Sequence, residues 1–374
     1  MKPVTLARVP LTRPYVDQAE ADAAAAALQS GFVVQGPRVK EFERLVGAWV
    51  GTRHALAVSS ATTGLHLALA ALDVGAGDEV LVPSFTFPAT GNVVLHQGAT
   101  PVLVDVRTDD HAIDIEDARR KITSRTRAIM PVDPFGLPYD ADGIGRLAEE
   151  HGLAIVEDAA CAIGATYNGR PAGGLGTIGV FSFHGRKIIT TGEGGMVMTD
   201  DDDLAARLAR LRNHGAERKG LRVTFVEPGF NYRLSDIAGA IGVAQMGKLA
   251  GIVSQRRSLA GRLSERLAGV DRLTPQAEPA GRVHAYQSYV VLLDEGVDRD
   301  TVVERLKDHG VESTIGTYAL HMEPVFQRLG YRDKDLPGAR VLLERSLTLP
   351  LFPGMSDAEL DQVATAVTDV LREA

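Results

Sequence analysis

The strongest constraint on the fold is a regular alternation of short apolar runs with longer segments of helical periodicity. The apolar runs predict strands at His54–Val58, Glu79–Val82, Pro101–Asp105, Thr126–Pro131 and Leu153–Glu157. Helices are predicted between them, at Thr62–Leu72, Phe87–His96 and Ala141–His151. Strands that alternate with helices in this way favour parallel pairing, so we expect an α/β fold with a mainly parallel central sheet flanked by helices.

The chain is long enough for two domains, since its 374 residues exceed what one core usually serves. Two N-terminal helices are expected, at Asp17–Ser30 and Pro37–Val50. After Thr177 the pattern changes to strand, turn and strand, followed by helices at Asp201–Leu211, Ser235–Leu249 and Ser254–Leu267. From about Leu273 we expect a strand at His284–Leu293, a helix at Arg299–His309 and a last helix at Asp357–Leu371. We therefore predict a large domain with the N-terminal helical segment at residues 1–250, and a smaller α+β C-terminal domain with its connecting helix at residues 251–374.

Composition excludes some classes of protein. The formal net charge is −8, which disfavours a general nucleic-acid binder. Cys161 is the only cysteine, so no internal disulfide is possible and a reducing compartment is expected. No apolar run approaches the length of a signal peptide or a membrane span. We expect a cytoplasmic protein with no membrane or nucleic-acid partner.

One familiar motif is rejected. Residues Gly174–Gly179 match G-x-G-x-x-G, but a dinucleotide-binding fingerprint follows a strand and opens a helix. Here the motif follows a polar turn and leads into an apolar run, which argues against nicotinamide or flavin binding. The ten histidines do not cluster at metal-ligand spacing, so no metal site is predicted.

Three short stretches carry the chemistry. The first is Ser59-Ser60-Ala61-Thr62-Thr63-Gly64, between a predicted strand and a predicted helix. Free backbone N–H groups and the positive end of the helix dipole make such a turn a phosphate cradle. The alternative is an ordinary helix cap.

The second stretch places Asp158 just past the end of the apolar run Leu153–Glu157. Ligands of open α/β sheets bind at that edge, and a carboxylate there needs a partner to offset its desolvation. A protonated pyridine nitrogen is such a partner, with an attraction of roughly 4 kcal/mol at about 4 Å. The alternative is a structural carboxylate that caps a loop.

The third stretch is Phe181-Ser-Phe-His-Gly-Arg-Lys187, followed by the glycine-rich Thr190–Gly195. Lysine forms imines with aldehydes, and burial or a neighbouring cation lowers its pKa to the range that this reaction needs. Ser182 and Arg186 are candidate phosphate contacts, and glycines allow the backbone to approach a flat cofactor closely. The alternative is a solvated loop lysine.

Taken together, the segments SSATTG, PSFTF, EDAA, FSFHGRK, TTGEGGM and NYRLSD resemble, in this order, the DegT–StrS family of pyridoxal-phosphate enzymes. These enzymes are mostly nucleotide-sugar aminotransferases. The resemblance extends from Gly36-Pro37 to Pro350–Pro353. It implies the fold-type I aminotransferase fold, pyridoxal 5'-phosphate as cofactor, and a homodimer with its active site at the subunit interface.

The resemblance also implies residue roles. Lys187 would form the Schiff base and shuttle protons, and Asp158 would pair with the pyridine nitrogen. Ser60, Ala61, Thr62 and Ser182 would hold the phosphate. Phe87 would stack on the ring, unless it is a core phenylalanine, and Asn231 would reach the other subunit's phosphate, unless it is a turn asparagine. Two positions depart from the family: Cys161 replaces a usual Gln near the ring oxygen, and Asp133 stands where His is common, so we assign Asp133 no catalytic role.

The substrates follow from the resemblance alone. The donor would be L-glutamate, and the acceptor a nucleotide-linked 4-keto-6-deoxy sugar used in amino-sugar, polysaccharide or secondary-metabolite synthesis. The basic stretch Arg212–Arg222 is either a pyrophosphate contact or a solvated loop. The candidate residues for the substrate are His184, which is also a cofactor candidate, and Arg186, Lys219, Arg233 and His321.

Three other functions stay open on the same fold. One is an aminotransferase for a cyclitol or another secondary-metabolite ketone. Another is a sugar dehydratase, although such relatives carry histidine in place of the lysine. The third is a non-catalytic regulator, which the intact pair of Lys187 and Asp158 disfavours.

Overall fold

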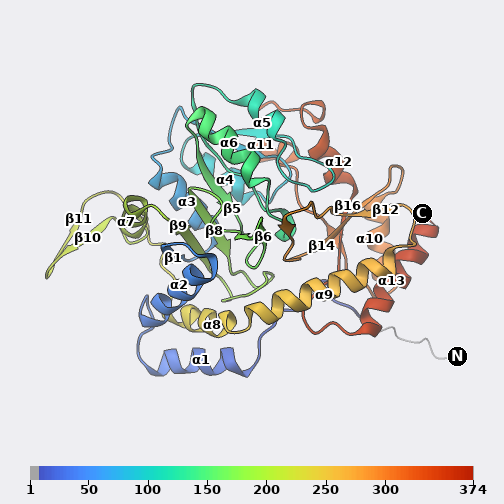
Figure 1. Ribbon diagram of the computed structural model, residues 1–374, viewed down its shortest axis with the longest axis horizontal. Coiled ribbons are helices and arrows are strands. Elements are labelled where there is room, and N and C mark those ends of the chain that lie inside the picture. The colour runs from blue at the N-terminus through green and yellow to red at the C-terminus, as the bar shows by residue number, and fades with distance from the viewer. Residues whose placement is uncertain (1–7, 374) are drawn as a thin grey trace.

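The computed structural model describes residues 8–373, and its main element is a seven-stranded sheet (Figure 1). In spatial order the strands are β1 (His54–Val58), β9 (Gly195–Thr199), β8 (Ile178–Ser182), β5 (Ala154–Asp158), β4 (Thr126–Ile129), β2 (Glu79–Pro83) and β3 (Thr100–Val104). Every neighbouring pair is parallel except the two that involve β9. The predicted mainly parallel sheet is therefore confirmed.

Helices cover both faces of this sheet, because alternate residues of each strand point to opposite sides. Along β8, Ile178 and Val180 pack with α3 (Ala61–Ala71), α4 (Ala89–His96) and α7 (Asp202–Leu211). Phe181 and Phe183 face the other side, where α2 (Pro37–Val50) packs. The same opposite side is covered further along by α5 (Ile115–Lys121) and α6 (Ala141–His151).

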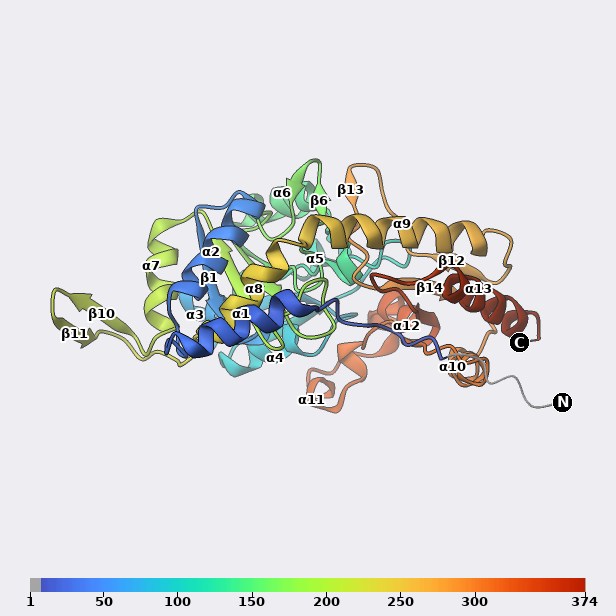
Figure 2. The ribbon, with the colours of Figure 1, turned by 90° about the horizontal axis from the view of Figure 1, so that it is seen from below.

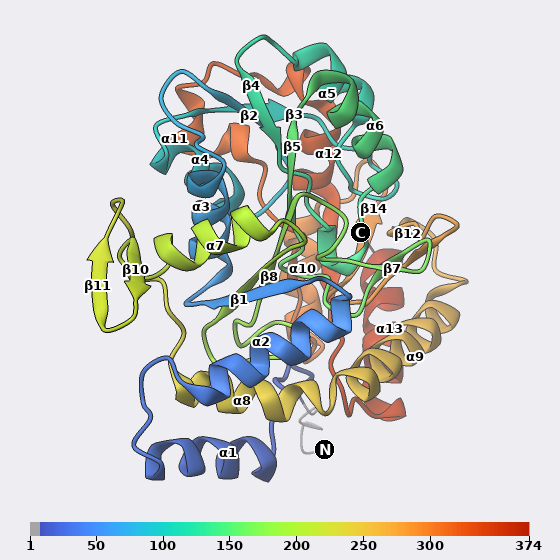
Figure 3. The ribbon, with the colours of Figure 1, turned by 60° about the vertical axis from the view of Figure 1, so that its left-hand side comes forward.

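The N-terminal helices begin and end where the sequence predicts. Helix α1 (Gln18–Gln29) opens with a capping box made by Asp17 and Glu20. Helix α2 starts at Pro37 and stops at Gly51, whose φ of 82° lies in the left-handed region. Helix α1 packs on α8 (Asp236–Met246), and α2 lies against the same helix (Figure 3). This places α1 below the sheet, at the outside of the molecule.

The C-terminal part forms a second, smaller antiparallel sheet in the order β12 (Leu273–Pro275), β14 (Tyr289–Leu293), β16 (Ser346–Leu349) and β15 (Thr314–Ile315). It shares a core with α10 (Arg299–Asp308), α13 (Asp357–Arg372) and α9 (Leu249–Leu267), the long helix that leads from the large sheet to this part (Figure 1). The first described segment joins it too, since Val9 pairs with Val311. The domain boundary at residue 250 stays a prediction.

One strand prediction is partly wrong. The run His284–Leu293 was expected to be a single strand, but β14 begins only at Tyr289. Tyr286 has a φ of 52°, and its ring stacks on that of His284 at 4.0 Å, so the chain turns there. Before this turn, β13 (Arg282–Val283) pairs with β6 (Thr166–Tyr167), which also pairs with β7 (Arg170–Pro171).

The basic stretch Arg212–Arg222, considered above as a solvated loop or a pyrophosphate contact, lies largely in a hairpin. Its strands are β10 (Ala216–Lys219) and β11 (Arg222–Phe225). The hairpin projects from the body of the molecule in all three ribbon views (Figures 1, 2 and 3). Leu221 at its tip is fully exposed, and Phe225 is 68% exposed.

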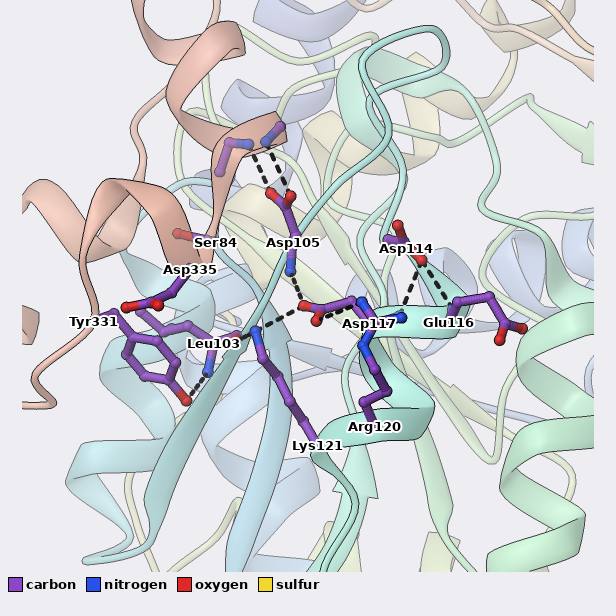
Figure 4. A network of polar contacts seen from close by, with 12 residues as sticks. Ser84, Leu103, Asp105, Asp114, Glu116, Asp117, Arg120, Lys121, Tyr331 and Asp335 are labelled. Carbon is purple, nitrogen blue, oxygen red and sulfur yellow. Dashed lines mark hydrogen bonds and ion pairs between the residues drawn. The ribbon is translucent and has the colours of Figure 1, made fainter.

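A segment of the C-terminal part crosses back onto the large sheet. It contains η2 (Leu320–Met322), α11 (Pro324–Gln327), η3 (Asp333–Asp335) and α12 (Pro337–Arg345), while another short turn, η1 (Pro134–Gly136), follows β4. Asp105, at the end of β3, accepts hydrogen bonds from the backbone N–H groups of Gly338 (2.9 Å) and Ala339 (2.8 Å), and so caps α12 from a distant part of the chain (Figure 4). The Tyr331 hydroxyl accepts a bond from Leu103 N at 3.2 Å. The two sheets are thus connected by specific polar contacts.

Within residues 8–373, no single helix is both long and apolar enough to cross a membrane. The pair α8 and α9 meets those two criteria together, with a bend of 59° between them.

We expect Asp105→Ala to lower the free energy of unfolding by about 1–2 kcal/mol, because both capped N–H groups of α12 lose their acceptor. Urea denaturation followed by circular dichroism measures the change. The matched control is Glu41→Ala, which removes an exposed carboxylate that pairs with Arg44 one turn along α2. Equal denaturation midpoints for the two variants would show that the cap contributes nothing.

Candidate active site

The predicted site residues meet at one edge of the seven-stranded sheet. Strands β1 and β8 are both antiparallel to β9, so they run in the same direction as β5, β4 and β2. Their carboxyl ends therefore lie at one edge, where ligands of such sheets bind. Ser60 follows β1, Phe87 follows β2, Asp158 ends β5 and Ser182 ends β8, while Lys187 lies in the turn between β8 and β9.

Asp158 is buried, with 5% of its surface exposed. Its Oδ2 accepts a hydrogen bond from the Thr90 hydroxyl at 2.8 Å, and its Oδ1 accepts one from Ala160 N at 3.2 Å. Burial raises the pKa of Asp158, and these bonds and the charge of Lys187 oppose that rise only in part. A cation at this carboxylate would complete its neutralisation. Thr90 was not predicted, since nothing distinguishes it from any threonine in the first turn of a helix.

Lys187 is half-buried, and its Nζ lies 3.0 Å from the Sγ of Cys161. Its backbone N–H donates to the carbonyl of His184 at 2.9 Å, which fixes the turn after β8. The ammonium also attracts the carboxylate of Asp158. The structure therefore brings Lys187, Cys161 and Asp158 together, although they come from two separate stretches of sequence.

The turn after β1 has the geometry of an anion-binding helix start. The Ser60 hydroxyl accepts a hydrogen bond from Thr63 N at 3.1 Å and caps α3, whose first residues are Ala61 and Thr62. Gly195 of β9 lies against this turn, and a Cβ there would approach the carbonyl oxygen of Ser60 to 2.7 Å. Glycine is thus required where the sheet meets the helix N-terminus. This geometry is compatible both with an ordinary helix cap and with a phosphate-binding site.

Phe87 is 63% exposed, so it is not a core phenylalanine. Its ring makes an edge-to-face contact with the ring of Tyr318, with 6.1 Å between the centroids. Tyr318 is itself 40% exposed, and it was not predicted as a site residue because it stands in no recognisable motif. The two rings form an exposed aromatic pair at the carboxyl end of β2.

Four further candidates lie around the site with few contacts of their own. His184 and Arg186 are exposed in the Lys187 turn, and the Nε2 of His184 is 3.8 Å from a carboxylate oxygen of Glu193. Arg233 pairs with Val58 at the end of β1, and its guanidinium donates to the Oδ1 of Asn213 at 2.5 Å. Asn231 is exposed two residues earlier, as a residue that reaches another subunit would be.

Two candidates lie elsewhere. Lys219 is in the projecting hairpin, with 83% of its side chain exposed, and its ion-pair partner is Glu217 at 3.6 Å. His321 is 3% exposed and its Nδ1 lies 2.8 Å from the hydroxyl of Ser84. Neither side chain joins the residues at the Lys187 turn within this one chain.

Two more carboxyl groups lie beneath Asp158. Glu157 accepts hydrogen bonds from the backbone N–H groups of Gly173 (2.6 Å) and Leu175 (2.8 Å). The rejected glycine motif is therefore a turn held by a carboxylate, and it leads into β8. Burial raises the pKa of Glu157 to about 7. Burial, and then repulsion from Glu157, raises the pKa of Asp133 well above its usual value.

These features fit pyridoxal phosphate. The buried carboxylate of Asp158 suits a protonated ring nitrogen, and the exposed face of Phe87 suits a flat ring. The N-terminus of α3 suits a phosphate. Lys187 stands within reach of the same edge as the only group of this set that forms imines.

Comparisons with known proteins agree with this fit. Residues 14–368 match the model of the DegT/DnrJ/EryC1/StrS aminotransferase family. The chain belongs to this family. It is 36% identical over 381 aligned residues to the spore coat polysaccharide biosynthesis protein SpsC of Bacillus subtilis, an alignment that covers 98% of each chain.

Solved structures give the same result. The aminotransferase TlmJ from Streptoalloteichus hindustanus superimposes with a TM-score of 0.92 at 34% identity, over 98% of this chain and 99% of TlmJ. Spr1654 from Streptococcus pneumoniae, in its PLP form, has a TM-score of 0.93 at 28% identity, over 98% and 99% of the two chains. The fold-type I aminotransferase fold, the transaminase class and pyridoxal phosphate as cofactor are thus confirmed for this DegT-family chain.

The carboxyl cluster predicts a pH dependence of stability. A carboxyl group with a raised pKa keeps a proton that the unfolded chain releases, so folding loses stability as pH rises above about 4. Asp133→Asn removes this loss, because the amide is neutral and its Oδ1 still accepts from Tyr139 N. We expect the variant without cofactor to be more stable than the parent at pH 8 by at least about 1 kcal/mol, with no advantage near pH 4.

Urea denaturation of the apoprotein at the two pH values measures this difference. Asp142→Asn is the control, since that carboxylate is half-exposed and pairs with Arg170 at the surface. A stability difference for Asp133→Asn that is the same at both pH values would contradict a protonated Asp133.

Proposed function

We propose that this chain transfers an amino group from L-glutamate to a nucleotide-linked keto-sugar. The observation that carries the proposal is the placement of Lys187 and Asp158 at one sheet edge, with an exposed aromatic ring and a helix N-terminus beside them. When bound, pyridoxal phosphate supplies an aldehyde that exchanges amines and a ring that accepts electrons. The remaining steps belong to the side chains of the protein.

Lys187 has two roles in this proposal. Its amine would hold the cofactor, and would be free again once the donor amine takes its place. The free amine would then serve as the base that takes a proton from the donor α-carbon and as the acid that returns it. In this structure Nζ donates to the Sγ of Cys161 at 3.0 Å, and a thiol is a weak acceptor that the amine can exchange for the cofactor.

Asp158 would hold the proton on the ring nitrogen. Its carboxylate is buried, and the hydrogen bonds from Thr90 and Ala160 fix its orientation. At an effective dielectric constant near 20, an ion pair at about 4 Å is worth roughly 4 kcal/mol. That attraction is enough to keep the nitrogen protonated at neutral pH.

The phosphate would lie at the start of α3, held by Ser60, Ala61 and Thr62, with Ser182 beside it. Ser182 is 7% exposed at the end of β8, next to this turn. Asn231, exposed in this chain, would reach the phosphate of a second copy, so the proposal includes a homodimer with shared sites.

The sugar substrate is supported by the relatives' names and by charge. SpsC is named for polysaccharide biosynthesis, and PseC of Helicobacter pylori, at 25% identity and a TM-score of 0.93, for pseudoaminic acid biosynthesis. The side chains that would meet a nucleotide sugar are the exposed His184 and Arg186, the half-buried Arg233 and, from the hairpin, Lys219. A 4-keto-6-deoxy sugar is the acceptor that we propose, in the cytoplasm, where a single cysteine stays reduced.

The alternatives differ at identifiable residues. A dehydratase of this fold carries histidine at the lysine position, so Lys187 favours amination. A regulator would not need the buried contact of Thr90 with Asp158. A cyclitol aminotransferase would share all residues at the cofactor and differ only in the acceptor.

We expect purified protein with pyridoxal phosphate to be yellow and to lose its colour with borohydride, which leaves the cofactor on Lys187 as a stable amine. Peptide mass spectrometry locates the label. Lys187→Ala should remain unlabelled and lose at least about a thousandfold in transamination rate, since one residue carries both covalent and proton-transfer steps.

The control is Lys40→Ala, which removes an exposed lysine of α2. It should be labelled on Lys187 like the parent. Full transamination by Lys187→Ala would refute the assignment.

The acceptor is identified by a panel of nucleotide-linked keto-sugars and free cyclitol ketones, with L-glutamate as donor. We expect nucleotide sugars to react with a kcat/KM at least about a hundredfold above that of the free ketones, because contacts remote from the reacting carbon are used in the transition state. Preferential reaction of a cyclitol ketone would instead establish the alternative.

A further inference from the structure

We propose that His321 is a positioning residue for the cofactor, and that it acts through Ser84 on the loop that carries Phe87. This inference rests on the proposed function, since it takes Phe87 as the ring that stacks on pyridoxal phosphate. It assigns His321 to the support of the site, away from the substrate. The segment Tyr318–His321 is called the strap below.

The strap is paired with the loop after β2 through the backbone. Thr86 N donates to the Tyr318 carbonyl at 3.0 Å, and Leu320 N donates to the Ser84 carbonyl at 2.7 Å. Phe85 and Ala319 form the antiparallel bridge between these two bonds. The loop that presents Phe87 is thus fixed by a segment that lies more than 200 residues later in the chain.

The side chain of His321 adds the one hydrogen bond between side chains that joins the strap to this loop among the described residues. Its Nδ1 lies 2.8 Å from the Ser84 hydroxyl, and both side chains are buried. The Nε2 faces the carboxylate of Asp333, at 3.7 Å, and has no hydrogen bond among the described residues. Burial lowers the pKa of His321, which favours the neutral ring, and in either tautomer Nδ1 can bond to the Ser84 hydroxyl. A side chain that is 3% exposed has little surface to offer a sugar.

The far side of the strap is anchored as well. Downstream of it, Tyr331 bonds to Leu103, and Asp105 caps α12, both at β3 next to β2 (Figure 4). Gly338 fits closely there, because a Cβ would approach the Val106 carbonyl oxygen to 2.1 Å. These contacts fix the position of the strap relative to the sheet edge. The hydrogen bond between His321 and Ser84 then links the strap to the loop after β2.

Movement of the loop would alter two contacts of the cofactor together. Phe87 is presented at its end, where its ring contacts only that of Tyr318 among the described aromatic side chains. Thr86, one residue earlier, bonds through its hydroxyl to that of Thr90 at 3.0 Å, and Thr90 bonds to Asp158. The position of Phe87 and the hydrogen bond from Thr90 to Asp158 thus both depend on how the loop pairs with the strap at Ser84.

Two pairs of variants separate positioning from plain stability. Ser84→Ala removes the hydroxyl and leaves every backbone bond. His321→Asn places an amide where Nδ1 lies, whereas His321→Gln places it where Nε2 lies, so only the Asn variant keeps a partner for Ser84. The control is Ser264→Ala, which removes another hydroxyl that bonds to a ring-bearing side chain, Tyr289, at 2.8 Å in the C-terminal part.

Each apoprotein is titrated with pyridoxal phosphate, and the dissociation constant and the visible circular dichroism of the bound cofactor are measured together with the melting temperature. We expect Ser84→Ala and His321→Gln to bind pyridoxal phosphate roughly three- to tenfold more weakly and to show a reduced dichroic band. His321→Asn should stay within about twofold of the parent. Ser264→Ala should bind like the parent even where its melting temperature falls.

The outcomes are distinct. If Ser84→Ala and His321→Gln bind the cofactor like the parent and show only a lower melting temperature, His321 is structural and the inference is wrong. Equal weakening by His321→Asn and His321→Gln also overturns it, because the Ser84 bond would then not matter. A parent that binds no pyridoxal phosphate, or is not trapped by borohydride on Lys187, overturns the proposed function itself.

Discussion

The site depends on one buried charge, the carboxylate of Asp158 at the end of the central strand β5. Burial makes its ionised form costly, and the hydrogen bonds from Thr90 and Ala160 offset that cost only in part, so its pKa stays raised. The remaining stabilisation must come from a cation in front of it. In the function that we propose, a protonated cofactor ring would supply that cation, and Lys187 approaches the same edge from the next strand. The carboxylate would then account both for the binding of a cofactor and for the place of its reactive end.

The precise arrangement around Asp158 requires close backbone approaches that only glycine permits. Gly195 lets β9 touch the first turn of α3, and Gly64 lets α3 pack against Val180, which a Cβ would approach to 2.8 Å. Because of these two contacts, the N-terminus of α3 lies beside the ends of β1 and β8. The N-terminus of α3, which we propose as the phosphate site, is therefore fixed by the sheet itself, whereas Phe87 is presented on a loop that the sheet does not fix.

Much of this could be predicted from sequence, because it follows from local pattern. The strand at His54–Val58 and the helix at Pro37–Val50 have the predicted bounds, since periodicity and helix caps depend only on residues near one another in the sequence. Residues that follow parallel strands must meet at one edge, which placed Ser60, Asp158 and Lys187 together. The misjudged run at His284 shows the limit, because its apolar and aromatic residues favour a strand while Tyr286 adopts a left-handed turn.

The features that the sequence did not predict are contacts between distant segments, because such contacts produce no periodic pattern in the sequence. Ser84 reads as an ordinary serine after a strand, and His321 as a candidate ligand, until the fold places them 2.8 Å apart. No sequence feature links Asp105 to Gly338 either, yet the hydrogen bond between them helps to fix the strap. The C-terminal part therefore does more than cover the site. Since the strap holds the loop that carries Phe87, a change in the packing of the small sheet should reach the cofactor site through Ser84. The Lys187 turn also meets this part of the chain, because the Gln287 side-chain amide donates to the Arg186 carbonyl at 3.1 Å.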